Sequence, residues 1–428
     1  MAKKAEIEQT EIEAPYELPD GWKWCLLGDI VEVLNGYAFK SENYVHQGIR
    51  VIRITNVQDG YIEDLKPCFY PEEYLNNLSQ YTLYENDLLI SLTGNVGRVA
   101  LLPKNFLPAA LNQRVGCLRE KNNQISKKYI AYYLRQHKFL SDCIKSSKGT
   151  AQLNMSTEWL KRYPIPLPPT LAKQQRIVNR IEIMFAKLDQ AQEKAQSVLD
   201  SFEPRKAAIL HKAFTGELTA KWRKENGVAD DSWEEKTVGD CCTSLKYGTA
   251  KKSESSGKVA VIRMGNLQHG EIEYDDLVFS NDEEDIKKYS LPKGDVLFNR
   301  TNSPEWVGKT SIYRGDIPAI YAGYLIKLDY IKTMLIGDYL NYMLNSPNAK
   351  EYCNSVKTDG VNQSNINAQK IGAYEIPVPS LPEQQKIVRI LDTVLEKESR
   401  AKETARTVLD QIALLKKSIL ARAFRGEL

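Results

Sequence analysis

The sequence has no run of eighteen apolar residues, only four histidines and no Cys-x-x-Cys spacing among its seven cysteines. A transmembrane helix needs about 20 consecutive apolar residues, so no span is expected. Residues 1–17 begin with two lysines but lack the apolar core of a signal peptide, and we interpret them as a charged lead-in. The histidines and cysteines form no cluster with metal-ligand spacing. Free thiols in a reducing, cytoplasmic compartment are therefore expected, and a zinc site is not.

Signatures of catalysis are also missing. The chain has neither a Gly-x-Gly-x-x-Gly fingerprint nor a phosphate-binding Gly-x-x-x-x-Gly-Lys-Ser/Thr loop. The segment Asn302-Ser-Pro-Glu lacks the second proline and the aromatic residue of an adenine methyltransferase motif. A metal-dependent nuclease could be imagined from Asp20 with Asp64-x-Lys66, but the second half of the chain has no matching set. We expect a binding protein that is not an enzyme and carries no cofactor or metal of its own.

The sequence is an internal duplication. A shift of 210 positions places residues 171–218 on residues 381–428 without a gap, with 20 of these 48 positions identical. Both copies end on Ala-Phe-x-Gly-Glu-Leu. The preceding segments match in islands, such as VIRITNVQDGYIE from Val51 and VIRMGNLQHGEIE from Val261, and differ between them. One scaffold kept twice with unlike loops is suited to recognising two different targets.

The duplication defines the domain organisation that we predict. A lead-in (1–17) precedes a first globular head (18–163) and a first helical segment (164–219), and a second head (220–374) precedes a second helical segment (375–428). Short β-branched runs, Gly/Asp-bounded apolar strands and amphipathic helices around 127–145 and 337–352 indicate a mixed α/β (α+β) fold in each head.

The repeated tails carry a helical apolar seam. In the first copy it runs Ile177, Ile181, Met184, Leu188, Ala191, Ala195, Val198 and Phe202, and in the second it includes Ile387, Leu391, Val394, Ala401, Ala405, Val408, Ile412, Leu415 and Ile419. This 4-3-4-3 spacing predicts two coiled-coil helices, each about 60 Å long. Glu398 interrupts the second seam, and Pro204 should kink or break the first helix.

The two helices are expected to pair with each other. Because the second head must return the chain to the start of the second helix, we predict an antiparallel pair with a pseudo-twofold axis and a head at each end. Pairing of each helix with another molecule is the alternative.

Loop residues of both heads offer contacts suited to DNA. Lysines and hydroxyls can bind phosphates, and Asn, Gln and Arg can pair with base edges. For any one of them, a solvated polar group explains the sequence equally well. The candidate DNA-binding residues are Tyr37, Lys40, Thr93, Asn95, Asn112, Gln113, Arg114, Lys148, Thr150, Gln152, Lys246, Tyr247, Lys251, Lys252, Arg300, Asn302, Tyr324, Asn362 and Gln363. Arg53 and Arg263 recur at matching positions, which favours a structural or shared phosphate role, and Asn56 and Asn266 are interpreted as turn residues.

From about Leu18 onward the chain resembles the specificity subunits of Type I restriction–modification systems. The resemblance rests on Leu18-Pro-Asp-Gly-Trp-Lys-Trp, the Gln152-Leu-Asn-Met and Gln363-Ser-Asn-Ile segments, the Ile-Pro-x-Pro stretches, the Gln-Gln-Arg/Lys-Ile-Val helix starts and the two Ala-Phe-x-Gly-Glu-Leu ends. The first copy departs from the family's pattern at Ala172-Lys173, where the second copy has the more typical Pro382-Glu383.

The resemblance implies a function. Each head would read one half of a bipartite site in double-stranded DNA, and the helix pair would fix the gap and dock two modification subunits and, through them, restriction subunits. S-adenosylmethionine, ATP and Mg²⁺ would belong to those partners. The rival interpretations are a coiled-coil adaptor with two protein-binding heads and an enzyme with a hidden nuclease or methyltransferase site.

Overall fold

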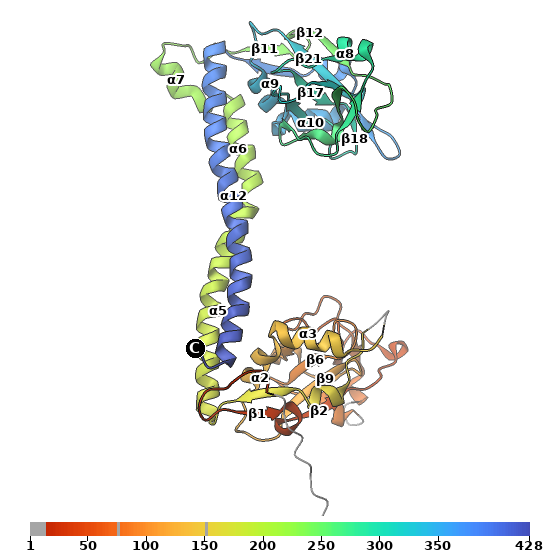
Figure 1. Ribbon diagram of the computed structural model, residues 1–428, viewed down its shortest axis with the longest axis vertical. Helices are drawn as coiled ribbons and strands as arrows, with labels where there is room; N and C mark the ends of the chain where they lie inside the picture. Colours follow the sequence, from red (N-terminus) through yellow and green to blue (C-terminus); the bar gives the residue numbers. More distant parts are fainter. Residues whose placement is uncertain (1–13, 75–77, 150–152) are drawn as a thin grey trace, which may run out of the picture. The chain divides into compact units, whose positions relative to one another are not determined.

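The computed structural model describes residues 14–74, 78–149 and 153–428 (Figure 1). These form two compact units: the first combines the chain up to residue 195 with residues 407–428, and the second comprises residues 196–406. Each unit thus contains one globular head together with portions of the long helices. None of the helices within the described ranges is long and apolar enough to cross a membrane.

The first head is built on two four-stranded sheets. One has the strand order β2-β9-β6-β7 and the other β4-β3-β8-β5. Only the pairing of β3 with β8 is parallel within these two sheets. The strands are β1 (Lys23–Leu26), β2 (Val31–Asn35), β3 (Ile49–Ile52), β4 (Phe69–Tyr70), β5 (Thr82–Leu83), β6 (Leu88–Ser91), β7 (Val99–Leu101), β8 (Ala109–Leu111), β9 (Val115–Glu120) and β10 (Pro164–Leu167), and the helices are α1 (Leu27–Ile30), α2 (Lys127–Leu134), α3 (His137–Ser146) and α4 (Thr157–Lys161).

The second head repeats this plan with a larger main sheet. Its sheets have the orders β12-β21-β17-β19-β15-β14, β16-β13-β20 and β18-β23-β22. The strands are β11 (Glu234–Thr237), β12 (Cys242–Tyr247), β13 (Val259–Ile262), β14 (Leu267–Gln268), β15 (Glu271–Ile272), β16 (Val278–Ser280), β17 (Val296–Asn299), β18 (Thr301–Asn302), β19 (Thr310–Ile312), β20 (Ala319–Tyr321), β21 (Leu325–Tyr330), β22 (Thr358–Asp359), β23 (Ser364–Asn365) and β24 (Glu375–Val378). The helices are α7 (Ala220–Glu225), α8 (Glu283–Tyr289), α9 (Gly337–Leu344), α10 (Pro347–Val356) and α11 (Ala368–Gly372).

The central strand of each main sheet is apolar because both of its faces are covered. All four residues of β6 are buried, and so are all four of β17. The helices α2 and α3 contribute to the same core as β6, and α9 and α10 to the same core as β17. The mixed α/β pattern of the sequence is therefore found in both heads.

The long helices are α5 (Leu171–Asp200), α6 (Phe202–Phe214) and α12 (Leu381–Phe424). The first helical tail is interrupted at Ser201, and Pro204 lies in the first turn of α6, where a missing backbone N–H costs little. The second copy carries Leu414 at the matching position, and α12 runs through it unbroken. The interruption predicted from Pro204 is confirmed.

Ion pairs show how α6 and α12 run in the second unit. Arg205 pairs with Glu398 at 2.8 Å, and Glu203 pairs with Lys402 at 3.5 Å. The partner numbers rise on one helix as they fall on the other, so these segments are antiparallel. Glu398, which interrupts the apolar seam, is thereby neutralised from the neighbouring helix.

The predicted seam is only partly correct. Most of its positions are buried or half-buried, but Ala401 is exposed and Leu415 is 49% exposed. Next to Leu415, Lys416 turns inward within the first unit, where its ammonium pairs with Asp189 at 2.6 Å and lies 5.9 Å from the Phe185 ring centre. A lysine stem over an aromatic ring therefore covers surface that the apolar pattern had assigned to leucine.

Each helical tail is fastened to its own head by a repeated glutamine. Gln174 Oε1 accepts a hydrogen bond from the Ser126 amide at 2.9 Å, and Gln384 Oε1 accepts one from the Ile336 amide at 2.9 Å. Both glutamines are buried. Since Ser126 and Ile336 precede α2 and α9, this contact holds the start of the long helix against the first turn of a head helix in both units.

Candidate nucleic-acid interface

The repeated Asn and Arg of the VIR segments build a turn. Asn56 Oδ1 accepts a hydrogen bond from the Arg53 amide at 2.9 Å, and Asn266 accepts one from the Arg263 amide at the same distance. Each arginine donates to a backbone carbonyl thirteen residues later, at 2.6 Å. The turn role predicted for the asparagines is confirmed, and the arginines have a structural role.

In the first head, four separate loops meet at one edge of the β2-β9-β6-β7 sheet, where β2 and β6 end and β9 begins. The Gln113 amide donates to the Tyr37 carbonyl at 2.9 Å, and the Leu92 amide donates to the Arg114 carbonyl at 3.0 Å. Thr93 and Lys148 both form backbone bridges with Asn154. We call this surface the first edge, made up of Tyr37, Thr93, Asn95, Gln113, Arg114 and Lys148.

The second head places the equivalent loops at the equivalent edge. The Arg300 amide donates to the Tyr324 carbonyl at 3.0 Å, as the Leu92 amide does to Arg114 in the first head. The short strand β18 pairs with β23, whose hairpin with β22 carries Asn362 and Gln363 at its tip. The second edge comprises Tyr247, Arg300, Asn302, Tyr324, Asn362 and Gln363.

Most side chains of the two edges are accessible to a ligand. Asn95, Gln113, Arg114 and Lys148 are exposed in the first edge, and Tyr324, Asn362 and Gln363 in the second. Because the backbone bridges above fix the loops, these side chains project from a rigid frame. Such a frame can present different side chains on one scaffold without changing the fold.

Arg300 is the most firmly oriented side chain of the second edge. Its guanidinium lies 4.7 Å from the centre of the Tyr247 ring, and its Nη1 donates to the Gly323 carbonyl at 3.3 Å. The Tyr247 hydroxyl in turn accepts from the Ala368 amide at 2.9 Å. Arg300 Nε is buried and has no hydrogen-bond partner within the part of the chain that the structure describes. The guanidinium is therefore held in place, and its Nη2, which forms no hydrogen bond to the residues that the structure describes, remains a donor for a ligand.

Other candidate residues are engaged elsewhere. Lys246 pairs with Asp329 at 3.0 Å, Lys251 with Asp282 at 2.7 Å and Lys40 with Glu42 at 3.8 Å. Asn112 is buried, and its Oδ1 accepts from the Arg114 amide at 3.2 Å. These residues are less suited to binding DNA directly than the edge residues, and Asn112 positions the turn that carries Arg114. Lys252 is exposed, and Thr150 and Gln152 lie outside the described residues.

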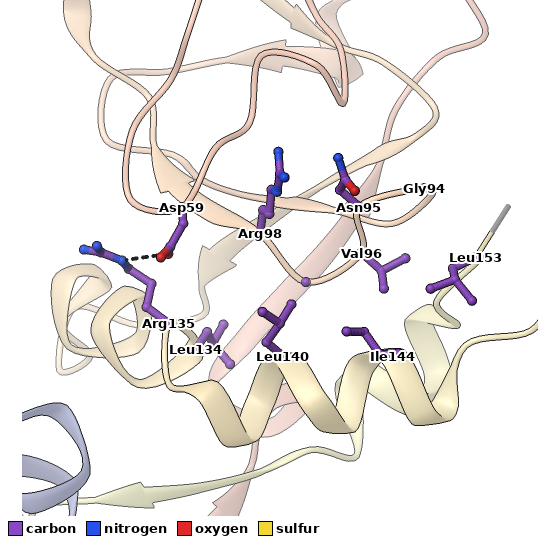
Figure 2. Close-up of a pocket in the computed structure, with 11 residues that line it drawn as sticks. Asp59, Gly94, Asn95, Val96, Arg98, Leu134, Arg135, Leu140, Ile144 and Leu153 are labelled. Carbon is purple, nitrogen blue, oxygen red and sulfur yellow. Dashed lines mark hydrogen bonds and ion pairs between the residues drawn. The ribbon is translucent and has the colours of Figure 1, made fainter. Parts of the chain in front are cut away.

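Sequence reasoning missed a matched pair of basic residues. Arg98 Nη1 donates to Gln58 Oε1 at 2.6 Å, and Lys309 Nζ donates to Gln268 Oε1 at 2.9 Å. Each follows a glycine, Gly97 or Gly308, at corresponding points of the two copies. Figure 2 shows Arg98 above a pocket of about 280 Å³ that Leu140, Ile144 and other residues line. The recurrence of a basic residue after this glycine in both copies was the available signal.

The residues considered for catalysis serve structural contacts. Asp64 pairs with Arg50 and lies within hydrogen-bonding distance of the Asn56 amide group, and the Lys66 carbonyl accepts from Arg53. Asn302 Oδ1 accepts from the Ser303 amide at 2.8 Å. Within residues 14–74, 78–149 and 153–428, no three His, Cys, Asp or Glu side chains gather to hold a metal ion.

Comparison with known proteins identifies similar chains over nearly the full length. A family model described as the Type I restriction modification DNA specificity domain matches residues 19–199 and again residues 230–408. The EcoKI specificity subunit of Escherichia coli K12 is 25% identical over 424 residues, covering 96% of this chain and 90% of that protein. The StySPI specificity subunit of Salmonella potsdam is 24% identical over 423 residues, with the same coverage.

Solved structures share the fold. A chain of a type I R-M system structure has a TM-score of 0.72 at 18% identity and covers 97% of this chain and 100% of its own length. The HsdS subunit from Thermoanaerobacter tengcongensis has a TM-score of 0.65 at 17% identity, with the same coverage.

Proposed function

The chain belongs to the family of Type I restriction modification DNA specificity domains, which it carries twice, and from this membership we propose that each head reads one half of a bipartite DNA site. As a Type I specificity subunit, it determines the DNA sequence on which its complex acts. The first edge and the second edge are the proposed reading surfaces.

The observation that carries this proposal is the pair of matched edges. The same backbone hydrogen bonds, from Leu92 to Arg114 and from Arg300 to Tyr324, organise both surfaces at 3.0 Å. The side chains on that frame differ: Gln113 and Arg114 in the first head correspond to Gly323 and Tyr324 in the second. Equal frames with unlike donors and acceptors would recognise two unlike base sequences.

We assign different roles to the residues of each edge. Arg114, Gln113, Arg300, Asn362 and Gln363 have the planar, bidentate groups that discriminate guanine and adenine in the major groove. Lys148, Thr93 and the tyrosine hydroxyls are suited to phosphate contacts, which position the protein without reading sequence. This division makes separate predictions for sequence preference and for salt dependence.

The long helices are proposed to set the spacing between the half-sites and to dock modification subunits. A paired helix is stiff, so two modest half-site affinities on one rigid frame would combine into a much higher one. The coiled-coil pairing and the pseudo-twofold relation of the copies belong to this proposal. So does the absence of catalysis, with S-adenosylmethionine, ATP and Mg²⁺ used by the partner subunits.

The direct test is selection from a randomised duplex library. The purified chain, alone and with a co-expressed modification subunit, is incubated with the library, and retained DNA is sequenced. We expect two short, unlike motifs at one fixed spacing. Absence of enrichment with the modification subunit present would refute the proposed function and favour a protein-binding adaptor.

A matched pair of variants ties each motif to a head. Gln113→Ala with Arg114→Ala should relax the first motif and leave the second unchanged. Asn362→Ala with Gln363→Ala should do the reverse. Loss of both motifs in either variant would contradict independent reading by the two edges.

A further inference from the structure

The second unit contains a cleft of about 540 Å³ between the long helices and the second head. Lys206 and Ser399 of α6 and α12 line one side, and Trp306, Lys309 and Lys350 of the head line the other. We propose that this lysine cleft binds the phosphate backbone of the DNA next to the second half-site. The proposal rests on the proposed function and adds a contact that the sequence did not suggest.

The lysines of the cleft lack neutralising partners. Lys206, Lys309 and Lys350 form no ion pair within 4.0 Å among the residues that the structure describes, and only Lys309 has a side-chain hydrogen bond, to Gln268. Of the acidic residues that line the cleft, Glu271 is held by Arg314 at 2.6 Å, which leaves Glu305. Three positive charges thus share one concave surface that an anion would stabilise.

The pKa shifts have the direction expected for such a cluster. Burial lowers the pKa of Lys206, and the nearby charges of Lys350 and Lys402 lower it further, against an opposing effect of Glu203. Burial also lowers the pKa of Lys309, again with a contribution from Lys350 and an opposing one from Glu273. Both shifts mean that the charged forms are incompletely stabilised within the protein.

The first unit provides an internal comparison. A Cβ on Gly97 would lie 2.9 Å from Cys143 Sγ, and one on Gly308 would lie 2.8 Å from Cys353 Sγ, so the two loops and helices correspond. From this register Lys350 corresponds to Leu140, and Asn354 to Ile144. The pocket of the first unit, shown in Figure 2, therefore has Leu140 and Ile144 on α3 where the second unit presents a lysine and an amide. Its charged lining residues are Arg98 and the ion pair of Arg135 with Asp59.

The helices differ in the same sense. Lys206 aligns with Lys416 in the repeated tails, and Ser399 aligns with Asp189. In the first unit Lys416 pairs with Asp189 at 2.6 Å, whereas in the second unit serine replaces that carboxylate. Two differences between the copies, at the positions of Leu140 and Asp189, thus give the second unit one more lysine and one fewer carboxylate at these places.

The position of the cleft favours DNA over another anion. A neighbouring hollow shares Trp306 and Lys309 with the cleft and reaches Asn302 of the second edge. Its charged lining is mixed, with Arg263 and Lys309 beside Glu273, Asp275 and Asp276. Trp306 is 53% exposed, and the Lys309 ammonium lies 4.0 Å from its ring centre. The lysine cleft thus adjoins the proposed base-reading edge through Trp306 and Lys309, so its three cations lie where phosphates that flank the bases can reach them.

The test measures salt dependence with the triple variant Lys206→Gln, Lys309→Gln and Lys350→Gln. The control removes three exposed lysines elsewhere in the same unit, Lys224→Gln, Lys293→Gln and Lys332→Gln. Both are assayed with the full chain and a duplex that carries the two motifs enriched by the wild-type protein. Log affinity decreases as log salt concentration rises, and the magnitude of this slope should be about 2–3 smaller for the cleft variant than for the wild-type protein. Each lost phosphate contact reduces the magnitude by about 0.9.

A second variant imitates the first unit. Lys350→Leu with Ser399→Asp should lower the slope by about 1–2 and leave both selected motifs unchanged. Circular dichroism and the unfolding temperature establish that each variant is folded. Equal slopes for the wild-type, cleft and control proteins would overturn the inference while the motifs still support the proposed function.

Two other outcomes are also decisive. Weakened assembly with a modification subunit at an unchanged salt slope would overturn the inference and assign the cleft to a protein partner. A wild-type chain that enriches no motif would refute the proposed function, and the inference would fall with it.

Discussion

Glu383 Oε1 accepts a hydrogen bond from Arg223 Nη1 at 2.7 Å, with the Glu383 side chain fully buried and the Arg223 side chain 7% exposed. Thr219 donates to the same oxygen at 2.6 Å. These contacts lock the start of α12 to the segment that follows α6 in the second unit. The first unit has Lys173 at the position of Glu383, and this residue is exposed.

We predict that Glu383→Gln destabilises the second unit by about 3–5 kcal/mol, because it removes the buried counter-charge of Arg223 and leaves only the exposed Asp230, 3.4 Å away. Lys173→Gln, the matched change in the first unit, should alter stability by no more than about 0.5 kcal/mol. Urea unfolding measures the free energy of unfolding of both variants. Equal effects of the two substitutions would show that the buried pair contributes nothing specific.

We predict that Gly308→Ala destabilises the second head by about 1–3 kcal/mol, because its φ of +87° is strained for other residues and a Cβ would meet Cys353 Sγ at 2.8 Å. The double variant with Cys353→Ala should recover the steric part and leave the backbone part. Thermal unfolding provides the comparison. A tolerated Gly308→Ala would mean that the loop carrying Trp306 can shift.

We predict that Arg300→Lys weakens recognition of the second motif by about 1–3 kcal/mol, since lysine cannot supply the planar fork held over Tyr247. The first motif is the internal control and should be retained. Competition binding with duplexes altered in one motif at a time measures the effect. A uniform loss over both motifs would assign Arg300 to general DNA binding or to folding.

We predict that stability falls at alkaline pH. Burial raises the pKa of Cys353 to about 11, above its ordinary value of 9.0. Below pH 9 both states keep the proton; between about pH 9 and about pH 11 the unfolded thiol ionises while the folded one does not, so stability is lost as pH rises. Cys353→Ala should reduce that loss by about 2 kcal/mol. An unchanged pH slope in urea unfolding would contradict it.

Local chemistry made much of the fold predictable. The duplicated tails, the helical periodicity, the break at Pro204 and the turn roles of Asn56 and Asn266 all depend on residues close in sequence. The seam prediction was wrong at Leu415 because the stem of Lys416, with its charge held by Asp189, covers part of the neighbouring helix instead. Sequence spacing could not anticipate that exchange.

The candidate site was less predictable for the same physical reason. The sequence by itself determined a twice-used scaffold with polar, divergent loops, because repeats and apolar periods are properties of contiguous residues. Only the tertiary structure decided which loop residues share an edge, that Arg300 is aimed by Tyr247, and that Lys206 lacks the carboxylate that neutralises Lys416. Charge pairing and ligand access depend on distances between segments far apart in the chain, and packing alone sets those distances.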